Sequence, residues 1–139
     1  MNNLGDRCNA IEECYEFMLA YAAQGLAADG GEGRGGQVRG FLERAAQALS
    51  GLADVYALTV KQEDVNPPGP YAAFQAVLDR DARSSLAAIE LVLVQPAISS
   101  QLIDNLNASI HLRALLTDLF LIDEILKLHK NASKPAVTS

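Results

Sequence analysis

The sequence has no tryptophan and few other aromatic residues, with four tyrosines and four phenylalanines in 139 residues. Hydrophobic residues nevertheless make up 50% of the chain, and alanine and leucine supply much of that share. These two residue types favour helices, whereas aromatic residues are enriched in strands. The length is common for one domain. We therefore predict one all-α domain spanning residues 1–139.

Charged residues are also scarce, at 20% of the chain, and the formal net charge is −6. The basic residues are scattered, and their closest grouping is Lys127, Lys130 and Lys134. A negative chain repels both a phosphate backbone and an anionic membrane surface. No run of residues approaches the roughly 18 apolar positions of a membrane span, and no signal peptide is recognisable. We expect no nucleic acid and no membrane as partners, and a cytoplasmic location.

The chain contains only two cysteines and two histidines. Cys8 and Cys14 lie six residues apart on one predicted helix, so they point in different directions and should not form a disulfide. Cys8, nearer the helix start, is the better candidate for a reactive thiol. The motifs Gly-x-Ser-x-Gly, Cys-x-x-Cys, Gly-x-x-x-x-Gly-Lys and His-Glu-x-x-His are all missing. We therefore expect no cofactor and favour a non-enzymatic role.

Apolar residues recur at steps of three and four in four segments, which predicts an antiparallel bundle of about four helices that dimerisation could complete. Asp6 should cap the first helix and Ser99 or Ser100 the last. A glycine-rich connector, a proline-rich connector and a flexible tail separate or follow the helices. The predicted helices cover about 6–27, 36–62, 70–94 and 100–130, the connectors 28–36 and 63–70, and the tail 131–139.

The segment 86–94 is apolar nearly all round and would also suit a buried strand. We favour a helix because no second strand candidate exists to pair with it, and a lone strand would leave its backbone groups without partners. Pro96 then provides a natural end to the helix.

Gly31, Gly33 and Gly36 match the spacing of a phosphate-binding loop, with Arg34 and Arg39 nearby. That motif normally joins a strand to a helix, whereas here a helix precedes it. Seven glycines lie between positions 25 and 40, so a chance match is easy. We interpret the segment as a flexible connector.

Asp104, His111 and Asp118 recur every seven residues on the last predicted helix. Seven residues correspond to about 10 Å of helical rise, too far for two side chains to bind one metal ion. A solvated face is the simpler interpretation, and His111 remains a weak metal candidate in a symmetric dimer. Asp81 interrupts the apolar face of the third helix. Either it marks the point where that face turns to solvent, or it is paired across the bundle, and the first interpretation needs fewer assumptions.

The favoured function is protein association, as a homodimer or as an accessory or regulatory subunit of a larger partner. The last predicted helix is apolar over more of its circumference than a small bundle needs, and surplus apolar surface often marks an interface. The expected contact residues are Leu112, Leu116, Phe120 and Leu128.

An alternative is a bundle that binds a small apolar or aromatic molecule in an internal pocket. Its lining would consist of Tyr15, Tyr21, Tyr56 and Phe74. An enzyme or a metal site centred on His111 is the least favoured alternative, because no constellation of catalytic residues accompanies this histidine.

Overall fold

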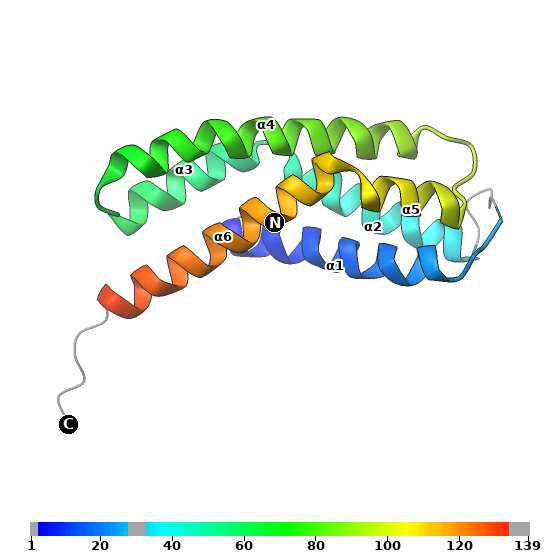
Figure 1. The fold of residues 1–139 in the computed structure, drawn as a ribbon, viewed down its shortest axis with the longest axis horizontal. Coiled ribbons are helices and arrows are strands. Elements are labelled where there is room, and N and C mark those ends of the chain that lie inside the picture. Colours follow the sequence, from blue (N-terminus) through cyan, green and yellow to red (C-terminus); the bar gives the residue numbers. More distant parts are fainter. Residues whose placement is uncertain (1–2, 28–32, 134–139) are drawn as a thin grey trace, which may run out of the picture.

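A computed structural model describes residues 3–27 and 33–133, and these residues form six α-helices and no β-strand (Figure 1). The all-α prediction is confirmed. The helices are α1 (Leu4–Ala23), α2 (Gly33–Leu49), α3 (Leu52–Glu63), α4 (Pro68–Leu93), α5 (Ser100–Ala108) and α6 (Ile110–Ser133).

Two predicted helices are each broken into two, which raises the number from about four to six. Gly51 separates α2 from α3 and has a φ of 72°, a conformation that glycine adopts without a steric penalty. Ser109 separates α5 from α6 with an extended backbone, and its Oγ accepts a hydrogen bond from the Leu112 amide at 3.3 Å. The apolar periodicity continues across both breaks, so it could not reveal them.

Several predicted helix ends were wrong by a few residues. Asn3 caps α1 in place of Asp6, and its Oδ1 accepts a hydrogen bond from the Asp6 amide at 2.8 Å. The second predicted helix begins at Gly33, and the third begins at Pro68. Ser99 does cap α5, as one of the two serines expected there. Residues 86–93 are helical, so the strand alternative is excluded.

The two flexible segments of the prediction lie partly outside the described residues. Positions 28–32 of the glycine-rich connector and 134–139 of the tail are not described. The rest of each segment is helical, because α2 includes residues 33–36 and α6 includes residues 131–133.

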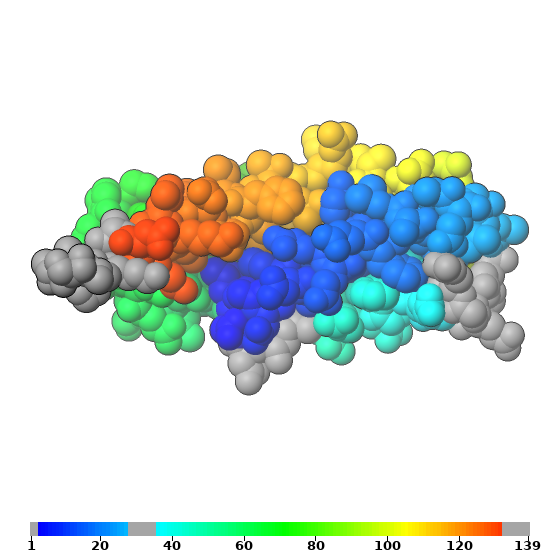
Figure 2. All heavy atoms as spheres, turned by 90° about the horizontal axis from the view of Figure 1, so that it is seen from below, coloured from blue at the N-terminus to red at the C-terminus, as the bar shows by residue number. Residues whose placement is uncertain are grey.

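The helices run roughly along one long axis, with α3 following α2 end to end and α6 continuing from α5 at an angle (Figure 1). At one end α1 packs against α2 and α5, and α4 packs against α2 and α5. The other end is formed by α3, the first half of α4 and the second half of α6. Seen from below, the second half of α6 extends past the start of α1 (Figure 2). Helix α4 therefore spans both ends of the bundle and contacts different helices at each end.

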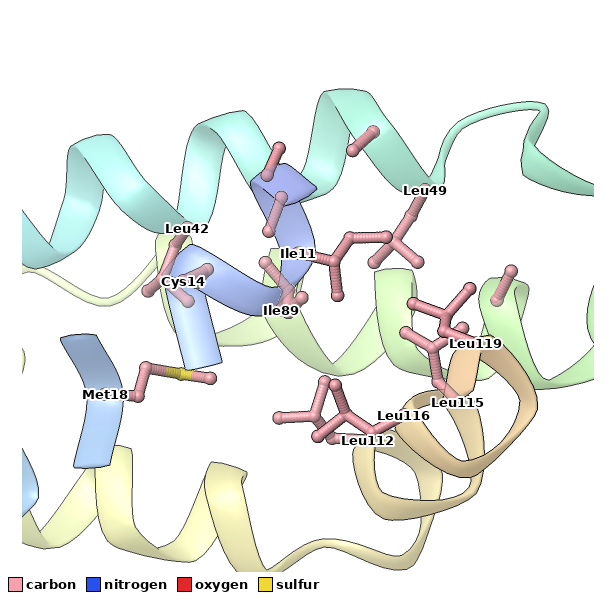
Figure 3. Close-up of a cluster of buried hydrophobic side chains, with 14 of the residues drawn as sticks. Ile11, Cys14, Met18, Leu42, Leu49, Ile89, Leu112, Leu115, Leu116 and Leu119 are labelled. Atoms are coloured by element: carbon pink, nitrogen blue, oxygen red, sulfur yellow. The ribbon is translucent and has the colours of Figure 1, made fainter. Parts of the chain in front are cut away.

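The core is a continuous cluster of buried aliphatic side chains (Figure 3). Ile11, Cys14 and Met18 of α1 meet Leu42 and Leu49 of α2 and Ile89 of α4, and α6 contributes Leu112, Leu115, Leu116 and Leu119. The spacing of three and four residues along α6 directs these four leucines to one side of the helix. That side of α6 is therefore used by the fold itself.

Polar side chains fix the ends of the helices. The Tyr21 hydroxyl donates a hydrogen bond to the Ile98 carbonyl at 2.7 Å, and the Ser100 hydroxyl donates to the Tyr21 carbonyl at 2.6 Å. Arg39 donates to the carbonyls of Leu93 and Gln95, at 3.0 and 2.5 Å. The two Arg39 bonds satisfy backbone acceptors at and just after the end of α4, where the helix leaves its last carbonyls without partners.

Candidate contact surface on helices α4 and α6

An apolar groove opens between the first half of α4 and the second half of α6. Its volume is about 330 Å³, and Tyr56 of α3 contributes to its wall. In Figure 1 the second half of α6 diverges from α4 along this stretch. Beyond the groove, α6 returns to the end of α3, where His129 Nε2 lies 2.9 Å from the Glu63 carbonyl oxygen. The lining consists of Tyr56, Pro70, Tyr71, Phe74, Leu121, Ile122, Ile125 and Leu126.

A second apolar row runs along the side of α6 that faces away from the core. We name this the outer row; it consists of Ile110, Ala114, Thr117, Leu121, Ile125 and Leu128, spaced by three or four residues. Its large members are strongly exposed, Leu121 at 49%, Ile125 at 42% and Leu128 at 59%. Side chains with this spacing share one face of a helix. Helix α6 is therefore apolar on two faces, and the fold covers one of them.

Helix α4 continues this surface with small or apolar side chains. Their spacing of four or seven residues keeps them on one side of the helix; they are Ala73, Val77, Ser84 and Leu91. Of these, Leu91 is 66% exposed. They neighbour Asp81 and Ser85, the positions at which α4 meets α6, and the Ser85 hydroxyl donates to the His111 carbonyl at 2.9 Å. We call the outer row, these four α4 residues and the groove the contact face.

A pair of carboxyl groups occupies the seam between α4 and α6. Asp118 is only 6% exposed, and its Oδ2 has no hydrogen-bond partner. Burial, a hydrogen bond with Asp81 and the negative charge of Asp81 raise the Asp118 pKa from 3.8 to about 7, and only Arg80 opposes this rise. Two adjacent carboxylates repel each other, so one of them retains a proton at pH values at which an exposed aspartate is ionised. The pair can therefore hold a proton in the seam.

These two residues correct the expectations for both aspartates. We expected Asp118 on a solvated face and, for Asp81, preferred a turn toward solvent to pairing across the bundle, but the two residues meet across the packed helices. Arg80 Nε lies 3.9 Å from Asp81 Oδ1 and is the nearest cation to the pair. The error arose because the position of a polar residue on one helix does not reveal which residue of another helix faces it.

Two of the four expected contact residues lie in the core. Leu112 and Leu116 are 2% and 5% exposed, because they point toward the packed helices. Phe120 and Leu128 are exposed, and Leu128 belongs to the outer row. The prediction identified the correct helix but combined residues from its buried and exposed sides. It missed Leu121, although the spacing from Leu121 to Ile125 and Leu128 is visible in the sequence.

The four expected pocket residues do not share one pocket. Tyr56 and Phe74 do lie together in the groove, with ring centroids 6.4 Å apart in an edge-on arrangement. Tyr21 is fully buried and Tyr15 is partly buried, both on α1, which contributes no residue to the groove. The missing wall comes from α6, and sequence periodicity cannot place α6 opposite Tyr56.

The structure also places the other candidate residues, which are Cys8, His111 and Asp104. Cys8 is buried, and burial together with the negative charges of Glu12 and Asp123 raises its pKa to about 12, which disfavours the reactive thiolate. His111 is exposed. Asp104 belongs to a separate hollow at the end of α1. Within residues 3–27 and 33–133, no three His, Cys, Asp or Glu side chains are grouped so as to hold a metal ion.

Within the glycine-rich motif, Gly31 and the Arg34 side chain lie outside what the structure describes. Gly33 and Gly36 are part of α2, and the Arg39 guanidinium is occupied by the carbonyls at the end of α4. This arginine is therefore engaged in helix packing and not free to receive an anion.

Comparisons of the chain with protein-family models, with curated proteins and with solved structures found no match. Among the described helices, none is sufficiently long and apolar to cross a membrane. The contact face and the carboxyl pair are thus the features from which function has to be inferred.

Proposed function

We propose that this protein acts by associating with another protein through the contact face. The observation that carries the proposal is the outer row of α6, in which Leu121, Ile125 and Leu128 remain between 42% and 59% exposed beside an apolar groove. Single exposed leucines are ordinary, but a row of them along a helix next to a groove is typical of helix-in-groove recognition. A partner helix would cover the row and fill the groove.

The geometry favours a protein partner over a small molecule. Ligand pockets usually enclose most of the ligand surface. Here the walls of the groove include Leu121 and Ile125, which are themselves half exposed, so a small molecule in the groove would leave the outer row uncovered. A helix is long enough to contact both the groove and Leu128. The association proposal therefore accounts for more of the exposed apolar surface.

A photo-crosslinking amino acid placed at position 128 tests the proposal in the cells that produce the protein. The matched control carries the same group at position 47, because Gln47 is exposed on α2, away from the contact face. We expect a discrete adduct of defined mass from position 128 and none from position 47. Equal adducts from both positions, or none from position 128, would contradict the proposal.

A small apolar or aromatic molecule in the groove is a second candidate function, supported by the aromatic wall of Tyr56, Tyr71 and Phe74. The volume of about 330 Å³ falls at the small end of ligand pockets. Native mass spectrometry of untagged protein tests this candidate. A stoichiometric adduct that disappears in a Phe74→Ala variant would support it, whereas a bare polypeptide mass would count against it.

A further inference from the structure

We infer that the partner covering the contact face is a second copy of this chain, packed face to face through α4 and α6. This inference rests on the proposed function and adds the identity of the partner. It follows from the distribution of charge, the size of the face and the position of the groove beside the outer row.

Charge is distributed so that two copies can meet at this face. The chain has a net charge of −6, so two copies repel each other over most of their surfaces. The outer row and the four α4 residues contain no ionisable side chain. The charged residues next to them along the helices are Arg80, Asp81, Arg113, Asp118 and Glu124, which sum to −1 with both aspartates ionised, against −6 for the whole chain. Acidic repulsion at the contact face is therefore weaker than the net charge of the chain would give.

The size of the face matches that of a stable dimer. Helix α6 has 24 residues, which corresponds to a length of about 36 Å. Two adjacent helices present a width of about 20 Å. The outline of the two helices on this side therefore measures on the order of 700 Å² per copy, or about 1,400 Å² in total, which is an upper bound for the contact face and lies within the usual range for specific interfaces. A much smaller partner, such as one short helix, would leave part of this area exposed.

The outer row and the groove are neighbours on one chain, which suits a two-fold arrangement. In an isologous interface each copy contributes the same patch, so any contact made once is made twice. The row of one copy can pack against the groove of the other, and the reverse contact follows from symmetry. Leu121 and Ile125 belong to both features, so this packing covers residues that the described part of the chain leaves about half exposed.

Sedimentation velocity of the purified full chain, from about 1 to 300 µM, tests the inference. We expect twice the chain mass of 14.8 kDa at the upper concentrations. Leu121→Lys should raise the dissociation constant at least about a hundredfold, because two unpaired ammonium groups would be buried per dimer. Leu58→Lys is the matched control, since Leu58 is 55% exposed on α3 and outside the contact face, and it should leave the dimer unchanged.

Circular dichroism of each variant checks that the helices remain folded, and Leu128→Glu provides a second disrupting variant if Leu121→Lys does not fold. A dimer that both disrupting variants leave intact would overturn the inference. A monomer throughout the concentration range would overturn it as well. If that monomer still gives a crosslink to a different protein from position 128, the proposed function stands and only the partner is wrong; without any crosslink, both fail.

Discussion

Asp81 of α4 and Asp118 of α6 form a hydrogen-bonded carboxyl pair across the helix seam, with Asp118 only 6% exposed. The pair has Arg80 as a weak counterion, at 3.9 Å from Asp81. The seam therefore contains a group whose protonation differs between the folded and unfolded chain, which makes folding depend on pH.

The first prediction concerns the pH dependence of stability. The Asp118 pKa rises from 3.8 in the unfolded chain to about 7 in the folded one, so between these values the folded chain binds more protons. The free energy of unfolding should consequently fall as the pH rises from about 4 to 7. Asp118→Asn cannot titrate, and it should flatten this slope and raise the melting temperature at pH 8 by several degrees.

Thermal melts across this pH range provide the measurement, with Asp104→Asn as the exposed control. Glu12 also has a raised pKa, caused by burial and by Asp123 and Glu16, so some slope should remain in Asp118→Asn. An unchanged slope in Asp118→Asn would show that the carboxyl pair does not control the pH dependence.

The second prediction concerns the glycines of α2 and of the break that follows it. Gly51 has a φ of 72°, so Gly51→Ala should destabilise the fold by about 1 kcal/mol. Gly40 lies inside α2 with open space around it, so Gly40→Ala should stabilise the fold by up to about 1 kcal/mol. Urea denaturation of both variants gives the two values, and equal signs would contradict the described break.

The third prediction concerns Arg39, which donates to the carbonyls of Leu93 and Gln95. Arg39→Ala should cost about 1–3 kcal/mol of stability, because it leaves partly buried acceptors at the end of α4 without a donor. Arg44→Ala is the control, since Arg44 makes an exposed ion pair with Glu13 at 3.3 Å, and such pairs contribute about 0–1 kcal/mol. Similar losses in both variants would argue against the described role of Arg39.

The fourth prediction concerns the contact between the end of α1 and the start of α5. The Leu26 amide donates to Ser100 Oγ at 2.8 Å, and the Ser100 amide donates to the Leu26 carbonyl at 3.0 Å. Ser100→Ala removes the first bond and should increase hydrogen exchange of the Leu26 amide at least about tenfold. The amide of Leu78 in α4 should exchange as before, and an unchanged Leu26 rate would refute the contact.

The sequence predicted the helical fold well because its apolar periodicity is strong. The spacing of Val38, Leu42, Ala45, Leu49 and Leu52 in the second predicted helix corresponds to buried positions in the structure. The breaks at Gly51 and Ser109 were missed because one residue in an unusual conformation barely disturbs a periodic pattern. The break between α3 and α4 was expected from the prolines, although only Pro67 lies between the two helices, and Pro68 and Pro70 stand in the first turn of α4.

The candidate site was less predictable because it depends on which helices face each other. Periodicity shows that α6 has apolar residues on more than one side, but Leu116 and Leu121 look alike until a neighbour covers one of them. The Asp81–Asp118 pair was missed for the same reason, since its members lie 37 positions apart and no local signal in the sequence relates them. The local sequence thus predicts the helices, whereas the contacts between helices depend on the three-dimensional packing.

Solvent paramagnetic relaxation of leucine and isoleucine methyl groups shows whether a second copy covers the outer row of α6. Within one chain, Leu121 and Leu128 are about as exposed as Leu19 and Leu58, at 49%, 59%, 46% and 55%. In concentrated protein we expect much weaker relaxation at Leu121 and Leu128 than at Leu19 and Leu58. Comparable relaxation at all four leucines would contradict it.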